Sequence, residues 1–162
     1  GFGMRACGYS PSYTFEKAKG KRIAYAVDVE SVLQNADYVF ICVPLNAQTH
    51  HLIDAELLAK MKGSAYLINC ARGGIVKEEA LEEALRKKKI AGAACDVFYE
   101  EPIQSCHPLL YLENFIATPH IGANTEEALL RVGMEVARGI VQRLHGEAKA
   151  DYAGKTVTNR RN

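Results

Sequence analysis

The sequence predicts a doubly wound α/β domain of the Rossmann type, built on a parallel sheet. Apolar runs of strand length recur along the chain and are separated by polar stretches of helical period, which is typical of strands joined by crossover helices. Three runs, Tyr38–Val43, Ala65–Asn69 and Ile90–Asp96, show little apolar–polar alternation. Strands of this kind are buried on both faces, so we expect helices to cover each side of the sheet.

The remaining elements are bounded by changes in the hydrophobic pattern. Further strands are expected at Arg5–Tyr9, Ile23–Ala26 and Asn114–Thr118, and helices at Val29–Asn35, Asp54–Met61, Lys77–Lys87 and Asn124–His145. Asp54 is a candidate N-cap, and Asn124 and Thr125 open the last helix ahead of two glutamates in its first turn. The chain from Ala148 is polar with a basic end, so we expect an extended, loosely held tail.

Composition and charge predict a single soluble domain with neither a nucleic-acid nor a membrane partner. The chain has 162 residues, of which 48% are hydrophobic and 24% charged, and its net charge is +1. These values are typical of globular proteins and indicate no basic surface. No apolar run reaches membrane-spanning length.

The five cysteines indicate neither a disulfide framework nor a metal site. They form no CxxC pair and no cluster with histidine, which are the patterns of metal-binding and redox-active cysteines. Three of them, Cys42, Cys70 and Cys95, lie inside apolar runs. We therefore expect reduced, buried thiols in a cytoplasmic protein, and no bound metal.

The first residues match a dinucleotide-binding fingerprint in letters but not in context. The pattern G-x-G-x-x-G/A fits residues 1–6, yet it requires a strand before the glycines and a helix after them. No strand precedes Gly1 in this sequence, and Gly8 and Pro11 would break the first turn of a helix. We therefore interpret Met4–Tyr9 as the second strand of a nucleotide-binding fold.

The turn after that strand bears on the choice of cofactor. In nucleotide-binding folds this turn meets the adenosine ribose, usually through an acidic side chain, but Ser10 stands here. A carboxylate would repel the additional phosphate of NADP and a serine does not, while Lys17 and Lys19 could add positive charge. The sequence therefore leaves both NAD and NADP open.

An arginine follows one buried strand and precedes two glycines, at Arg72-Gly73-Gly74. Packing explains a charged side chain poorly at this place, whereas a planar guanidinium can bind a substrate carboxylate through two parallel hydrogen bonds. Ligands of open α/β sheets also bind at the carboxyl ends of the strands. Arg72 is therefore a candidate carboxylate-binding residue, and a plain surface arginine is the alternative.

Two further segments lie at the carboxyl ends of expected strands. Asp96 can accept hydrogen bonds from a nicotinamide carboxamide or order a loop, and Glu101 follows in the same loop, its backbone direction fixed by Pro102. His120 follows the next strand, where a nearby carboxylate would stabilise its imidazolium form. Such a pair suits a group that gives a proton to a ketone and takes one from an alcohol. A solvated acidic loop and a structural histidine are the alternatives.

In order and spacing, these segments resemble the D-2-hydroxyacid dehydrogenases. The resemblance extends from Met4 to about Gly146 and includes Ala36–Val39, Val43–Leu45, Thr49–Ile53, Met61-Lys62, Leu67–Ala84, Ala91–Pro102 and Thr118–Ala123. It implies a nucleotide-binding domain over residues 1–146 and a tail, residues 147–162, that returns to a substrate-binding domain. It also implies a homodimer acting on a small 2-hydroxy acid or 2-oxoacid.

The resemblance implies a role for each candidate residue. Arg72 would hold the substrate carboxylate, His120 would be the general acid in reduction and the general base in oxidation, and Glu101 would orient His120. Asp96 would contact the nicotinamide end of the cofactor, which carries the hydride. Glutamate at position 101 argues against the related formate dehydrogenases, where the partner of the histidine is glutamine. The residues expected to line the cofactor, besides Ser10, Arg72, Asp96 and His120, are Val43, Pro44, Cys70, Ala71 and Gly122.

Parts of the family pattern have no counterpart in this sequence. A strand, a glycine loop and a helix would precede Met4, and most of a substrate-binding domain would be present, so we expect a fragment or truncated chain. The glycine loop would supply the amides that hold the pyrophosphate, and the strand is the centre of the sheet. We expect these 162 residues alone to have no useful dehydrogenase activity, which NAD(P)H-dependent reduction of glyoxylate by them would refute.

Two other functions stay open on the sequence. C-terminal-binding-protein corepressors share the fold and the catalytic-type residues, which would make the protein a dinucleotide-sensing interaction protein. The other is a truncated remnant that acts only as a dimerising module. The substrate is undecided as well, because phosphoglycerate, hydroxypyruvate, glyoxylate and longer 2-oxoacids all fit.

Overall fold

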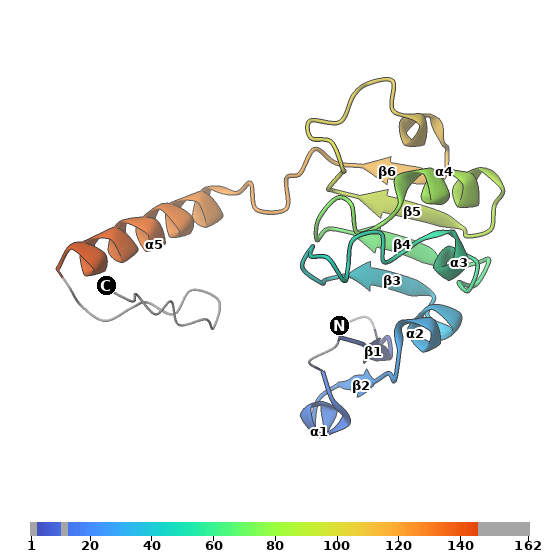
Figure 1. The fold of residues 1–162 in the computed structure, drawn as a ribbon, viewed down its shortest axis with the longest axis horizontal. Helices are drawn as coiled ribbons and strands as arrows, with labels where there is room; N and C mark the ends of the chain where they lie inside the picture. Colours follow the sequence, from blue (N-terminus) through green and yellow to red (C-terminus); the bar gives the residue numbers. More distant parts are fainter. Residues whose placement is uncertain (1–2, 11–12, 146–162) are drawn as a thin grey trace. The chain divides into compact units, whose positions relative to one another are not determined.

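The structure, a computed structural model, describes residues 3–10 and 13–145 (Figure 1). The chain divides into two units, Gly1–Ile121 and Gly122–Asn162. All described strands belong to the first unit, and one long helix belongs to the second.

The described strands all run parallel, as the sequence predicts. A two-stranded sheet pairs β1 with β2, and a four-stranded sheet has the order β3-β4-β5-β6. The strands are β1 Ala6–Gly8, β2 Ile23–Tyr25, β3 Tyr38–Ile41, β4 Tyr66–Asn69, β5 Gly92–Cys95 and β6 Phe115–Ala117.

Short helices connect the strands of the first unit. Three of them, α2 Val29–Asn35, α3 Ala55–Leu58 and α4 Glu78–Arg86, lie within the expected ranges. Two others, α1 Phe15–Ala18 and the 3₁₀ helix η1 Pro108–Tyr111, are not among the expected helices. Each has four residues, which is too short for a helical period to show in the sequence.

Aspartates start two of these helices. The Asp28 carboxylate accepts a hydrogen bond from the Ser31 amide at 2.7 Å, and the Asp54 carboxylate accepts from the Glu56 and Leu57 amides, each at 3.0 Å. These bonds satisfy amides that have no partner within the first helical turn. The predicted N-cap at Asp54 is therefore confirmed.

The glycine motif at the start of the sequence is not a dinucleotide-binding loop. Its last residue, Ala6, begins β1, and the first described helix begins at Phe15. A fingerprint loop would instead lead directly into a helix N-terminus. The interpretation of Met4–Tyr9 as a strand is confirmed for its central residues.

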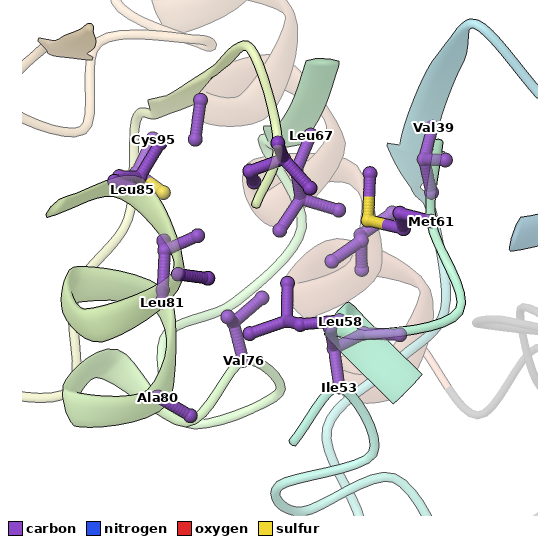
Figure 2. Close-up of a cluster of buried hydrophobic side chains, with 14 of the residues drawn as sticks. Val39, Ile53, Leu58, Met61, Leu67, Val76, Ala80, Leu81, Leu85 and Cys95 are labelled. Carbon is purple, nitrogen blue, oxygen red and sulfur yellow. The ribbon is translucent and has the colours of Figure 1, made fainter. Parts of the chain in front are cut away.

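The hydrophobic core lies on one face of the four-stranded sheet (Figure 2). Val39, Leu67 and Cys95 face it from β3, β4 and β5, and Leu58 of α3 and Leu81 of α4 pack in the same cluster. Burial of one large aliphatic side chain contributes about 1.5–3 kcal/mol. This layer therefore fixes α3 and α4 to the sheet.

The opposite face of this sheet is open at β3, β4 and β6 in the first unit, so the expectation of strands buried on both faces is wrong for β3 and β4, whereas no residue of β5 is exposed. Tyr38 is 53% exposed, Phe40 62%, Tyr66 44% and Ile116 67%, and the Tyr38 and Tyr66 rings stack at 5.6 Å. The reason is that the buried residues of α2, α3 and α4 all join the core cluster on the other face. An unbroken apolar run therefore alternates here between a covered and an uncovered face.

Of the three cysteines expected to be buried, Cys95 alone is. Cys42 and Cys70 are exposed, because each comes directly after the last residue of its strand, β3 or β4. Burial raises the pKa of the Cys95 thiol to about 12, so this thiol stays protonated at neutral pH. All five cysteines are free thiols.

The second unit contains α5, Glu126–Leu144. Its N-cap is Thr125, whose hydroxyl accepts from the Ala128 amide at 3.1 Å, rather than Asn124. Among the described helices, none combines the length and the apolar character that crossing a bilayer requires. The expected tail, residues 147–162, lies outside the described residues.

Candidate active site

Strand register brings the ends of four strands to one edge of the sheet. The last residues of β3, β4, β5 and β6 are Ile41, Asn69, Cys95 and Ala117, and they pair as neighbours in that order. The loops that follow these strands therefore begin side by side. Arg72, Glu101 and His120 belong to three of these loops.

Arg72 lies in a turn that a buried amide side chain holds. Asn69, 2% exposed, accepts from the Ala71 amide through Oδ1 and donates to the Arg72 carbonyl through Nδ2, both at 3.1 Å. The Arg72 side chain is exposed, and its Nη1 donates to the Ala71 carbonyl at 2.6 Å. Within the described residues the guanidinium forms no ion pair, so its outer edge can meet an external anion.

Glu101 and His120 form the pair that the sequence predicts. Glu101 Oε2 and His120 Nδ1 are 2.7 Å apart, and the Phe98 amide donates to Glu101 Oε1 at 3.0 Å. Both side chains are partly open to solvent, with exposed fractions of 36% and 47%. The other ring nitrogen, Nε2, has no hydrogen-bond partner among the described residues, so the imidazole can exchange a proton there.

These contacts also set the charge state of Glu101. The hydrogen bond from His120, followed by that from the Phe98 amide, lowers the pKa of Glu101 below its ordinary value. Hydrogen bonds to a carboxylate favour its charged form. The carboxylate is therefore ionised at neutral pH, where it stabilises a positive charge on the imidazole.

Asp96 orders the turn that carries His120. Its side chain is 7% exposed and accepts from the Thr118 hydroxyl and from the Ile121 amide, the latter at 2.9 Å. The Thr118 amide also donates to the Cys95 carbonyl at 3.0 Å. Of the two roles that the sequence left open for Asp96, loop ordering is therefore confirmed, and a contact with nicotinamide stays a prediction.

Four of the residues expected to line a cofactor lie at the same edge. Val43 and Pro44 follow β3, and Cys70 and Ala71 follow β4. Pro44 and Cys70 are exposed, and Val43 and Ala71 are half-buried. The segment after β3 is held by Thr49, whose hydroxyl donates to the Pro44 carbonyl at 2.6 Å.

The sequence that carries these residues matches a known protein family. The family model described as D-isomer specific 2-hydroxyacid dehydrogenase, NAD binding domain, matches residues 1–122. The chain belongs to this family. The expectation drawn from the ordered segments of the sequence is thus confirmed.

Curated relatives in the dehydrogenase family are similar over most of the chain. A D-3-phosphoglycerate dehydrogenase of Methanocaldococcus jannaschii is 45% identical over 146 residues, which are 90% of this chain and 28% of the relative. A glyoxylate/hydroxypyruvate reductase B of Enterobacter agglomerans is 40% identical over 97% of this chain and 48% of its own length. The chain therefore spans less than half the length of these relatives.

Solved structures of the dehydrogenase family have the same fold. The NAD-complexed D-isomer specific 2-hydroxyacid dehydrogenase of Lactobacillus delbrueckii ssp. bulgaricus is 29% identical with a TM-score of 0.79, over 91% of this chain and 48% of that one. A D-lactate dehydrogenase of Lactobacillus jensenii with NAD+ is 28% identical with a TM-score of 0.81, over 97% and 49%. The Rossmann-type α/β fold expected from the sequence is thus confirmed.

The described residues fit one end of the cofactor that this dehydrogenase family binds. Val43, Pro44 and Ala71 offer the apolar and backbone surface that the face of a nicotinamide ring requires. The glycines between β4 and α4 serve packing instead of phosphate binding, because a Cβ on Gly73 would lie 1.8 Å from the Phe98 carbonyl oxygen. The nicotinamide end therefore fits, whereas the described residues offer no pyrophosphate cradle.

Ser10 and Gly122, which are also expected to line the dinucleotide, do not belong to the loops after β3 and β4, and their role stays a prediction. Ser10 follows β1 in the two-stranded sheet, and its carbonyl accepts from the Tyr13 amide at 3.0 Å. Gly122 opens the second unit. No group of three histidine, cysteine or acidic side chains among the described residues could hold a metal ion.

Several residues that shape the candidate site are not among the sequence candidates. Asn69 holds the Arg72 turn, Thr118 joins the His120 turn to Asp96, and Gly73 allows the backbone at Phe98 to approach closely. A polar residue that ends an apolar run is the one signal that could have identified Asn69. The contacts of Thr118 and Gly73 span loops distant in sequence, so no local pattern marks them.

Proposed function

We propose that this chain supplies the nicotinamide-side catalytic groups of an oxidoreductase that interconverts a small D-2-hydroxy acid and its 2-oxoacid. The observation that carries the proposal is the 2.7 Å contact between Glu101 and His120, in loops that start at the same sheet edge as Arg72. A cation, an ionised carboxylate and an imidazole are the groups this reaction needs for substrate binding and proton transfer. NAD or NADP, when bound, supplies or accepts the hydride.

His120 acts at the oxygen of the reacting carbon. In reduction its Nε2 gives a proton to the carbonyl oxygen, and in oxidation it takes a proton from the hydroxyl. The Glu101 carboxylate accepts a hydrogen bond from His120 Nδ1. This bond fixes the orientation of the ring and stabilises the imidazolium before the proton is given. Asp96 holds the turn in place through Thr118 and Ile121.

Arg72 binds the carboxylate that all 2-hydroxy acids share. Its guanidinium is exposed and forms no ion pair within the described residues. A bidentate contact would fix both the position and the rotation of the substrate next to His120. Selection among 2-oxoacid side chains is then left to groups outside this contact.

Ser10 supports a choice between the two dinucleotides. A neutral side chain after β1 leaves room for the 2′-phosphate of NADP without the repulsion that a carboxylate would exert. We therefore infer that the protein accepts NADP as well as NAD. The ratio of kcat/KM values for NADPH and NADH measures this preference.

Substitution of Arg72 tests the proposal through steady-state kinetics. In the protein expressed from its complete reading frame, Arg72→Gln is expected to lower kcat/KM for glyoxylate or hydroxypyruvate by about 10–100-fold. This loss corresponds to the free energy that hydrogen bonds to a charged group contribute. Arg72→Lys should recover part of the loss, because it restores the charge but not the planar fork.

Arg86→Gln is the matched control. Arg86 lies on α4 and pairs with Glu82 at the surface, so its loss should leave the kinetics unchanged. Equal kcat/KM values for Arg72→Gln and the unsubstituted protein would rule out the assigned role of Arg72.

A further inference from the structure

We propose that a second glutamate–histidine pair, Glu78 and His107, positions Glu101 for its contact with His120. Glu78 Oε2 and His107 Nε2 are 3.1 Å apart. Glu78 is the first residue of α4, and His107 is the N-cap of η1. The inference rests on the proposed function, because it assigns to this pair the support of a catalytic contact rather than a contact with substrate.

Two consecutive backbone amides link the pairs. The Phe98 amide donates to Glu101 Oε1 at 3.0 Å, and the Tyr99 amide donates to Glu78 Oε1 at 2.7 Å. These residues lie in the loop from β5 to η1, which passes over β6 at the top of Figure 1. Because the two amides are neighbours, a displacement of Tyr99 also moves the amide that holds Glu101.

The surroundings of His107 determine which ring nitrogen carries the proton. Nδ1 accepts from the Leu109 amide at 3.4 Å, so the hydrogen of the neutral ring is on Nε2 and is donated to Glu78. The ring also lies edge-on to that of Phe98, with centroids 5.9 Å apart. His107 thus joins the first turn of α4 to the far end of the loop.

The Glu78–His107 pair is less exposed than the Glu101–His120 pair, as the different tasks of the two pairs require. The side chains of Glu78 and His107 are 19% and 24% exposed, against 36% and 47% for Glu101 and His120. Water competes less for hydrogen bonds in the more buried pair, which suits an anchor. The more open pair can meet a substrate.

Gly73 packs against the backbone of the same loop, at Phe98 and Tyr99. A Cβ at this position would lie 1.8 Å from the Phe98 carbonyl oxygen and 2.6 Å from the Tyr99 nitrogen. The Arg72 turn and the backbone that Glu78 holds are therefore in direct contact. An anchor at Tyr99 consequently fixes Glu101 relative to Arg72 as well as to His120.

Amide hydrogen exchange tests the proposal without any need for activity. In the protein expressed from its complete reading frame, Glu78→Ala deprives the Tyr99 amide of its acceptor, so faster exchange there is trivial. The proposal predicts that the Phe98 amide, whose acceptor Glu101 is unchanged, also exchanges about tenfold faster. Glu79→Ala, on the exposed side of the same helical turn, should leave both amides unchanged. Unchanged Phe98 exchange in Glu78→Ala would overturn the proposal.

Two substitutions of His107 provide a test that does not disturb α4. The amide of His107→Gln can reach the place of Nε2 and donate to Glu78, whereas His107→Asn can replace only the Nδ1 contact with Leu109. We expect Phe98 exchange to stay near normal in His107→Gln and to rise in His107→Asn. The same exchange rate in both variants would overturn the role of His107.

A kinetic cycle separates this inference from the proposed function. Glu78→Ala should lower kcat about tenfold with little change in KM, and should cause no further loss when Glu101→Ala is already present. Equal losses in both backgrounds would overturn the positioning role. Turnover that does not depend on Glu101 would overturn the proposed function instead, while the exchange test of the Glu78 anchor would still decide the inference.

Discussion

At the scale of single residues, the candidate site joins an uncommon backbone conformation to a charged pair. His120 has a φ of +53°, in the left-handed region where a side chain other than glycine costs of order 1 kcal/mol. Asp96 stabilises this turn from both sides of His120, through Thr118 and Ile121. The strain is thus balanced by contacts that also hold the imidazole next to Glu101.

The lowered pKa of Glu101 predicts a pH-dependent contribution to stability. Because the folded-state pKa is below the unfolded value of about 4.3, the contribution is fully present above that value and is lost as the pH falls through the folded pKa. Thermal unfolding of Glu101→Gln should therefore show a lower Tm than the unsubstituted protein at pH 6, with the difference shrinking as the pH falls below about 4.

Glu100→Gln is the control for this measurement. Within the part of the chain that the structure describes, the Glu100 carboxylate accepts one long bond, of 3.4 Å from Gln104, so the Tm of this variant should stay close to that of the unsubstituted protein throughout. A Tm difference for Glu101→Gln that is constant down to pH 3 would show that the pair with His120 does not stabilise the fold.

At the scale of elements, α4 ends at a residue in the left-handed conformation. Lys88 follows the C-cap with a φ of +52°. The Lys88 amide donates to the Leu85 carbonyl at 3.0 Å and the Lys89 amide to the Ala84 carbonyl at 2.8 Å. These are the two bonds of a Schellman motif, whose left-handed residue is usually glycine.

Lys88→Gly is therefore expected to stabilise the protein. Removal of the Cβ relieves the left-handed strain, and the strain energy relieved exceeds the entropic cost of glycine, for a net gain in stability of about 0.5–1 kcal/mol. Thermal unfolding should show a rise of about 2 °C in Tm. Lys87→Gly, one position earlier with a φ of −83°, should lower Tm. A Lys88→Gly variant less stable than the unsubstituted protein would contradict this interpretation of the helix end.

Element positions were predictable where the hydrophobic pattern is long enough. The range Val29–Asn35 expected for α2 is the range observed, and the expected ends of α4 differ by one residue at each side. The four-residue helices α1 and η1 are too short for a helical hydrophobic period to be recognised in the sequence. Burial was harder to predict, because Phe40 and Val39 are equally apolar and only the placement of the helices decides which is covered.

At the scale of the whole molecule, the parallel register is what assembles the candidate site. Arg72, Glu101 and His120 are far apart in sequence, yet each follows a strand whose last residue pairs with that of its neighbour. The residue types and their position after strands were enough to mark Glu101 and His120 as candidates, and the resemblance to the dehydrogenase family implied that the two form a pair. The supports at Glu78 and His107 depend on long-range contacts, which no local pattern encodes, whereas the contacts of Asn69 are local.

The kcat of a His120→Asn variant tests the central claim most directly. Asparagine tolerates the left-handed conformation of residue 120, so the variant removes the imidazole and keeps the turn. In the protein expressed from its complete reading frame, kcat for NAD(P)H-dependent reduction of glyoxylate or hydroxypyruvate should fall about 10²–10⁴-fold, while His145→Asn at the end of α5 has no effect. Turnover by a folded His120→Asn variant at the unsubstituted rate would contradict the account.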